Sequence, residues 1–181
     1  MRRLVTTLVA LVVQVAALSG QVSTGMSARS QVFVPVGAKK ANYTSVAIGA
    51  ELEGVLSFPG IDWIAGTVQS GYALVPIALE QDGMLGPSSL GLARVGLGVT
   101  GGVPLGNRFA AFGRGQAGAY LGILQGEASG AAPGLFAGGS AGVSMLLSPE
   151  WLAELSAGFG SHVGLFDGIS VSLSVSHRLG G

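Results

Sequence analysis

Residues 169–179 alternate between apolar and polar side chains at every position except His177. The apolar positions are Ile169, Val171, Leu173, Val175 and Leu179, and the positions between them include Ser170, Ser172, Ser174, Ser176 and Arg178. A β-strand points successive side chains to opposite faces, so this pattern predicts a strand with one apolar face and one polar face. Residues 44–58 and 151–163 repeat the pattern. Together the three segments predict an all-β chain.

Turn signals separate further segments of this kind. The predicted strands span residues 31–37, 44–58, 63–77, 89–103, 109–124, 134–147, 151–163 and 169–179. The first is short and contains Pro35, which strands tolerate at an end or edge. An even number of strands returns both ends of the chain to the same side. The connections alternate between tight Pro/Gly turns, as at residues 58–62, and longer polar loops, as at residues 81–88.

The charged residues are few and follow the same two-faced pattern. Beyond Arg3 there are sixteen, of which ten fall before the first predicted strand or in connections, Arg29 among them. The other six lie on the polar faces of the predicted strands: Glu51, Glu53, Arg94, Arg114, Glu154 and Arg178. A charge facing lipid at the bilayer midplane costs about 2–4 kcal/mol. We therefore predict a closed, antiparallel up-and-down transmembrane β-barrel of about eight strands with an apolar exterior.

The six strand charges are predicted to face inward and to pair with one another, with Gln69 and Gln116 joining the network. The interior of a barrel of about eight strands is just wide enough for side chains to fill. Arg94 fits less simply than the others, because apolar Leu92 shares its face. A bulge near Ala93 could reset the alternation.

The N-terminal residues predict export. Met1–Arg3 is positively charged, Leu4–Leu18 is apolar, and small residues follow. This is the pattern of a signal peptide, expected to span residues 1–20 and to be cleaved at an uncertain bond. A retained membrane anchor is the alternative. Residues 21–30 are expected to form a linker, and residues 31–181 the barrel.

Aromatic residues cluster near the predicted turns. Phe58, Trp63, Phe109 and Trp151 flank the tight turns, and Tyr43, Tyr120 and Phe136 lie toward the opposite strand ends. Amphipathic rings favour the membrane–water boundary, so we predict two interfacial girdles. The alternative is the general preference of strands for aromatic residues.

Three short motifs match known patterns without the structural context these need. Residues 96–101 and 113–118 both fit G-x-G-x-x-G, but each continues as a strand instead of the helix that holds a pyrophosphate. Ser140 lies in a G-x-S-x-G match followed by Asp167 and His177. The sequence does not show the strand-to-helix turn that holds the serine nucleophile of an α/β-hydrolase. The spacing of Gly134, Gly138 and Gly142 could mark a transmembrane helix, but alternation continues through it.

The chain resembles the small outer-membrane β-barrel domain family, whose best-known members are eight-stranded. The resemblance rests on the N-terminal segment, the opening Val34-Pro35-Val36-Gly37, the Gly-rich alternating strands and the Pro/Gly turns. It implies contact with the lipid bilayer and the outer-membrane assembly machinery, but no particular activity. Such barrels usually end in an aromatic residue, whereas this sequence ends Arg178-Leu179-Gly180-Gly181. Either that assembly signal is weak, or Leu179 serves in its place.

These observations predict an integral outer-membrane barrel with a structural or narrow-transport role and no catalysis. One alternative is a lipid-modifying enzyme that uses Ser140, His162 or His177. A less favoured one is a soluble lipocalin-like barrel, which would need an apolar interior. The chain contains no cysteine and has a formal net charge of zero without a basic stripe, so no metal, cofactor or nucleic acid is expected. We expect a monomer.

Overall fold

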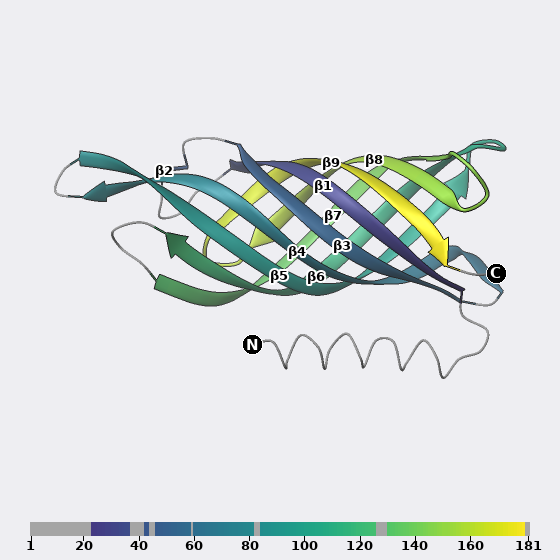
Figure 1. The fold of residues 1–181 in the computed structure, drawn as a ribbon, viewed down its shortest axis with the longest axis horizontal. Helices are drawn as coiled ribbons and strands as arrows, with labels where there is room; N and C mark the ends of the chain where they lie inside the picture. Colours follow the sequence, from purple (N-terminus) through teal and green to yellow (C-terminus); the bar gives the residue numbers. More distant parts are fainter. Residues whose placement is uncertain are drawn as a thin grey trace.

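The structure, a computed structural model, describes residues 23–36, 42–43, 46–58, 60–81, 84–125 and 130–179. These residues form nine antiparallel strands (Figure 1). The bounds are β1 Ser23–Val36, β2 Asn42–Tyr43, β3 Ala47–Phe58, β4 Ile61–Gln81, β5 Met84–Pro104, β6 Phe109–Gln125, β7 Gly130–Leu146, β8 Trp151–His162 and β9 Phe166–Leu179. Among the described residues, no helix is long and apolar enough to cross a membrane.

The sheet closes on itself. Each long strand pairs with the long strands before and after it in the chain, as β4 does with β5. The first long strand, β1, pairs with β3 and also with the last strand, β9, which closes the barrel. Ala28, for example, lies opposite Leu52 on one side and Val175 on the other. Closure leaves no free edge along the barrel body. The predicted eight-stranded up-and-down barrel is therefore confirmed, and β2 is a short addition that pairs with β4.

The first strand begins earlier than expected. Residues 23–30 lie within β1, and residues 24–30 pair on both sides, so this segment is not a linker. The sequence hides this because the outward residues Ala28 and Ser30 are small, which weakens the apolar–polar contrast. Two-sided pairing satisfies the backbone polar groups despite that weak pattern. The predicted signal peptide lies outside the described residues.

The barrel has two distinct ends, which we name the terminal end and the loop end. At the terminal end β1 begins, β9 finishes, and tight turns occupy residues 105–108 and 147–150 (Figure 1, right). At the loop end β4 and β5 project furthest, and they stay paired out to Gln81 and Met84 (Figure 1). The predicted loop at residues 81–88 is thus largely a continuation of the hairpin.

Large apolar side chains cover the outside of the barrel. Leu52, Leu97, Leu155 and Leu173, from four different strands, each expose more than half of their surface. The residues between them along each strand face inward and are mostly small, polar or charged. The exterior is therefore the apolar surface that contact with lipid requires.

The remaining sequence motifs lie in strands. The candidate helix around Gly134 and Gly142 is β7, which pairs with β6 and β8 along its length. The two G-x-G-x-x-G matches lie within β5 and β6, and no described helix follows either.

Glycine is abundant partly because inward aromatic rings lie over it. Gly96, Gly118 and Phe136 lie side by side on β5, β6 and β7. A Cβ atom on Gly118 would come within 2.8 Å of Cε1 of Phe136, and one on Gly96 within 2.8 Å of Cζ of the same ring. The glycines therefore provide the space that the ring fills.

Candidate functional site

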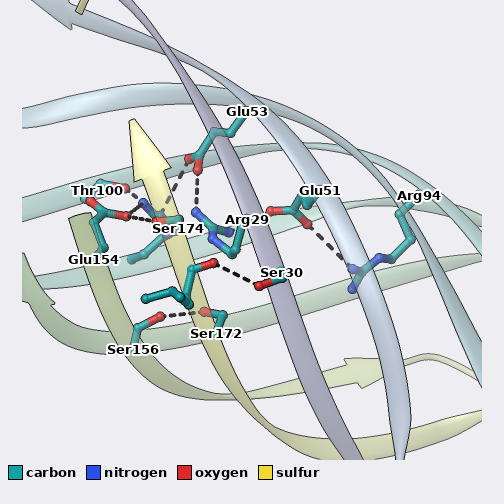
Figure 2. Close-up of polar contacts among 12 residues, drawn as sticks. Arg29, Ser30, Glu51, Glu53, Arg94, Thr100, Glu154, Ser156, Ser172 and Ser174 are labelled. Atoms are coloured by element: carbon teal, nitrogen blue, oxygen red, sulfur yellow. Dashed lines mark hydrogen bonds and ion pairs between the residues drawn. The ribbon is translucent and has the colours of Figure 1, made fainter. Parts of the chain in front are cut away.

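A cluster of ion pairs crosses the barrel interior, and Arg29 is at its centre (Figure 2). Its Nη1 donates to Oε1 of Glu51 at 2.6 Å, and its Nη2 donates to Oε2 of Glu53. Nη2 of Arg94 lies 3.6 Å from Oε2 of Glu51. Arg29 is 6% exposed, Glu51 3% and Glu53 1%. Fully desolvated charges of this kind are stable only when they are paired.

Arg114 links this cluster to the terminal end. Its Nη2 donates to Oε2 of Glu154 at 3.2 Å, and its Nε donates to Oγ1 of Thr100 at 2.9 Å. The same Nε lies 3.6 Å from Oε1 of Glu53. Ser174 donates to Glu154 at 2.8 Å. Among the described side chains, three buried arginines thus balance three buried glutamates.

The structure brings together five of the eight predicted lumen residues in this cluster: Glu51, Glu53, Arg94, Arg114 and Glu154. Gln69 is also buried, but its amide has no hydrogen-bond partner. Gln116 is half-buried beside a small cavity. Arg178 is exposed, because it lies one residue from the end of β9 at the mouth of the barrel.

The third arginine of the ion-pair cluster is Arg29 and not the predicted Arg178. Arg29 lies in the segment that the sequence predicts to be a linker, but this segment is part of β1. A usable signal exists in Ser27, Arg29 and Gln31, which alternate with less polar residues and all face inward.

Arg94 faces inward without any bulge. Residues 89–104 pair with β6 in unbroken register, and Leu90 and Leu92 are buried on the same face as Arg94. The predicted reset near Ala93 is therefore wrong. The alternation fails to reveal the inner face here because the interior itself becomes apolar toward the loop end.

A cluster of aromatic rings fills the loop end of the interior. Phe33, Tyr120, Phe136 and Phe166 are all buried and surround His162, with ring centroids 4.9–6.0 Å from that imidazole. The prediction that Tyr120 and Phe136 belong to an interfacial girdle is therefore wrong. Their parity places them inside, where the ring of Tyr120 also donates its hydroxyl hydrogen to the carbonyl of Val163 at 2.7 Å.

The tight-turn aromatic residues lie outside the barrel. Trp63, Phe109 and Trp151 are exposed on β4, β6 and β8 near the terminal end. The side chain of Phe58 and that of Tyr43 lie outside the described part of the structure. The exposed rings share one end of the barrel, so they can meet the same membrane boundary.

The residues of the hydrolase hypothesis do not form a catalytic arrangement. Ser140 is half-buried in β7, and neither ring nitrogen of His162 has a hydrogen-bond partner. His177 lies at the opposite end, where its Nε2 is 3.8 Å from Oε2 of Glu150. A serine nucleophile needs a base within hydrogen-bond reach. The described residues also contain no group of His, Asp or Glu that could hold a metal ion.

Solved structures with a similar fold are outer-membrane barrels. Neisserial surface protein A matches with a TM-score of 0.60 at 8% identity, over 87% of this chain and 97% of that one. The N-terminal β-barrel domain of Pseudomonas aeruginosa OprF matches with a TM-score of 0.54 at 13% identity, over 89% and 100%. Ail of Yersinia pestis matches with a TM-score of 0.52 at 14% identity, over 87% and 97%.

No protein-family description and no curated protein sequence matches this chain. The resemblance to small outer-membrane β-barrels is thus confirmed at the level of the fold.

Proposed function

We propose that the protein is an integral outer-membrane β-barrel with a structural role, whose interior is closed to the free passage of solutes. The observation that carries this proposal is the filling of the interior. Buried ion pairs occupy its middle, and the aromatic cluster around His162 occupies its loop end. Eight strands enclose a space that side chains can fill. A barrel filled in this way favours a membrane scaffold over a diffusion channel.

The apolar exterior supports the membrane location. Leu97 and Leu155 point away from the interior, whereas Glu53 and Arg29 point into it. A soluble lipocalin-like barrel needs the opposite arrangement, with ligand-binding apolar residues inside and polar residues outside. The predicted signal peptide at residues 1–20 fits this location, because outer-membrane proteins are exported.

The lipid-modifying alternative has less support. Ser140 and His162 line the same small cavity, but that cavity measures only about 40 Å³ and lies inside the barrel. A volume of that size holds about one to three water molecules and is too small for an acyl chain. We expect Ser140→Ala and the wild type to leave the surrounding lipids equally unchanged. A lipid hydrolase activity that Ser140→Ala abolishes would contradict the proposal.

The first test is gel mobility of protein folded in detergent, with and without boiling. A closed barrel resists unfolding by the gel detergent, so the unboiled protein is expected to migrate differently from the boiled one. Solubility without detergent, together with no mobility change, would contradict the membrane assignment.

The second test is conductance across a planar bilayer. The filled interior predicts no stable ion-conducting steps from the wild-type protein. The matched comparison removes filling at both levels, with Phe136→Ala at the loop end and Arg29→Ala with Glu53→Ala in the middle, and this variant is expected to conduct. Stable channel activity from the wild type would favour the narrow-transport role instead.

A further inference from the structure

The barrel interior contains a small cavity between the ion-pair cluster and the aromatic cluster. Its volume is about 40 Å³. One side of the wall is formed by β7, β8 and β9, which carry glycine and serine at the inward positions Gly138, Ser140, Gly160 and Ser170. These residues lack the bulk to fill the space, so the cavity follows from the composition of the wall.

Side chains that donate hydrogen bonds dominate the polar lining of this cavity. Two guanidinium groups, of Arg29 and Arg94, reach it, as do the imidazole of His162 and the amide of Gln31. No carboxylate is among its lining residues. The glutamates that balance the arginines contact them from elsewhere: both Glu51 and Glu53 bind Arg29.

Arg94 is the less completely neutralised of the two cations. Its nearest carboxylate oxygen, on Glu51, is 3.6 Å away, and its Nε has no hydrogen-bond partner. Once the amide of Gln31 is oriented to suit its neighbours, its oxygen accepts from both Nη1, at 3.2 Å, and Nη2, which leaves Nε as the unpaired donor. Arg94 is nevertheless only 6% exposed. A buried cation with unused donors favours a nearby negative charge.

His162 provides an independent indication of a ligand. It is 5% exposed, it lines the cavity, and neither Nδ1 nor Nε2 has a hydrogen-bond partner. The neutral imidazole has one N–H donor to offer. Buried polar atoms of folded proteins are normally paired with protein or with a bound species. Arg94 and His162, which both have unpaired buried nitrogens, thus line the same small cavity.

We propose that this cavity binds one small monovalent anion of halide size. Nε of Arg94 and an N–H of His162 would donate to it, and Arg29 would contribute positive charge. A buried water needs roughly 10–15 Å³ of such volume, so the space takes one halide or at most about three waters. Larger organic anions such as gluconate do not fit. The site is separate from the proposed structural role, and it does not depend on conductance.

The test compares chloride, bromide and gluconate as sodium salts at equal concentration. The protein is refolded from urea into detergent micelles in each salt, and the urea midpoint of unfolding is measured. Because the three salts are compared at equal concentration, general electrostatic screening is the same in each. A ligand that binds only the folded state lowers the unfolding constant by about elevenfold at ten times its Kd. We therefore expect a midpoint that rises with chloride or bromide and levels off, but that stays constant in gluconate.

Two matched substitutions separate the cavity from general salt effects. Gly160→Val fills it, and a Cβ at Gly160 meets no atom closer than 3.6 Å. Gly115→Val adds the same side chain to an exposed position, where a Cβ meets nothing within 4 Å. His162→Phe keeps an aromatic ring in the cluster but removes both nitrogens. The halide dependence should disappear in Gly160→Val, weaken in His162→Phe and persist in Gly115→Val.

Two outcomes would overturn the proposal. Equal midpoints in chloride and gluconate for the wild type would mean that the cavity holds only water. An undiminished halide effect in Gly160→Val would place the ion elsewhere. A ³⁵Cl NMR titration gives a direct reading if a variant fails to fold, because line broadening by the wild-type protein should be reversed by bromide.

Discussion

At the scale of single residues, the interior depends on a charge balance centred on Arg29. This side chain binds Glu51 and Glu53 together, and all three are almost fully buried. Removing one partner of a buried pair leaves an uncompensated charge, which costs more than the pair contributes. Stability should therefore respond strongly to Arg29 and weakly to the exposed Arg178.

We predict that Arg29→Met lowers the free energy of unfolding by about 3–5 kcal/mol, because two buried carboxylates lose their cation. Urea unfolding in detergent measures the effect. Arg178→Met is the matched control and should change it by less than about 0.5 kcal/mol, since surface substitutions have small effects. Adding Glu53→Gln restores the charge balance, with Arg94 beside Glu51 and Arg114 beside Glu154, and should recover part of the loss. Equal effects of the two arginine substitutions would contradict the central role of Arg29.

At the scale of strands, neighbours approach closely where inward glycines face each other. Gly118 on β6 lies between Gly96 on β5 and Phe136 on β7. A Cβ there would meet the carbonyl oxygen of Val95 as well as the ring of Phe136. Backbone atoms of a paired strand cannot move aside without breaking the ladder. A side chain at position 118 would therefore force β5 or the Phe136 ring to shift.

We expect Gly118→Ala to destabilise the barrel by about 1–3 kcal/mol, the usual cost of overpacking. Gly113→Ala is the control on the same strand, because a Cβ there meets nothing within 4 Å. The comparison uses the urea midpoint of each variant. A Gly118→Ala protein as stable as the control would show that β5 and the Phe136 ring make room for the methyl group at little cost.

The early start of β1 gives a second prediction about strands. Ala28 lies opposite Val175 in the β1–β9 ladder. Because the natural chain has no cysteine, Ala28→Cys with Val175→Cys should form a disulfide in the folded protein, detected as a mobility change reversed by reductant. Ala28→Cys with Ile169→Cys is the mismatched control. Equal cross-linking of both pairs would mean that residues 23–30 are a linker after all.

At the scale of the whole molecule, the barrel presents one apolar belt with aromatic residues gathered at the terminal end. Trp63 is 66% exposed and Trp151 is 45% exposed, both on the outer surface. Indole rings favour the boundary between headgroups and acyl chains. We propose that this end of the belt lies at one membrane surface, with the projecting β4–β5 hairpin beyond the other.

Tryptophan fluorescence tests this placement, because the chain contains only these two tryptophans. In vesicles, we expect lipids brominated near the headgroup to quench both more strongly than lipids brominated near the chain terminus. Trp63→Phe and Trp151→Phe assign the signal to each residue. Strong quenching by aqueous acrylamide, with none by either lipid, would contradict the girdle.

Much of the architecture could be predicted from sequence because alternation is a local property. The polar side of Glu51 and Glu53, and the apolar side of Leu155, follow from two-residue periodicity alone. The inward direction follows from the cost of exposing charge to lipid. The charged cluster was therefore predictable as a set of residue types. Its membership was predictable only where alternation was strong, which is why Glu154 was identified and Arg29 was missed.

What only the tertiary structure decided is which inward residues meet at the same height. The stagger of the eight strands brings Arg29 against Glu53, leaves Arg178 at the mouth, and gathers Phe33, Phe136 and His162 at the loop end. Stagger arises from closing the whole sheet, and no single segment encodes it. By itself the sequence determined a two-faced barrel with charges inside. Closure decided which charges pair, where the interior turns apolar, and where a cavity remains.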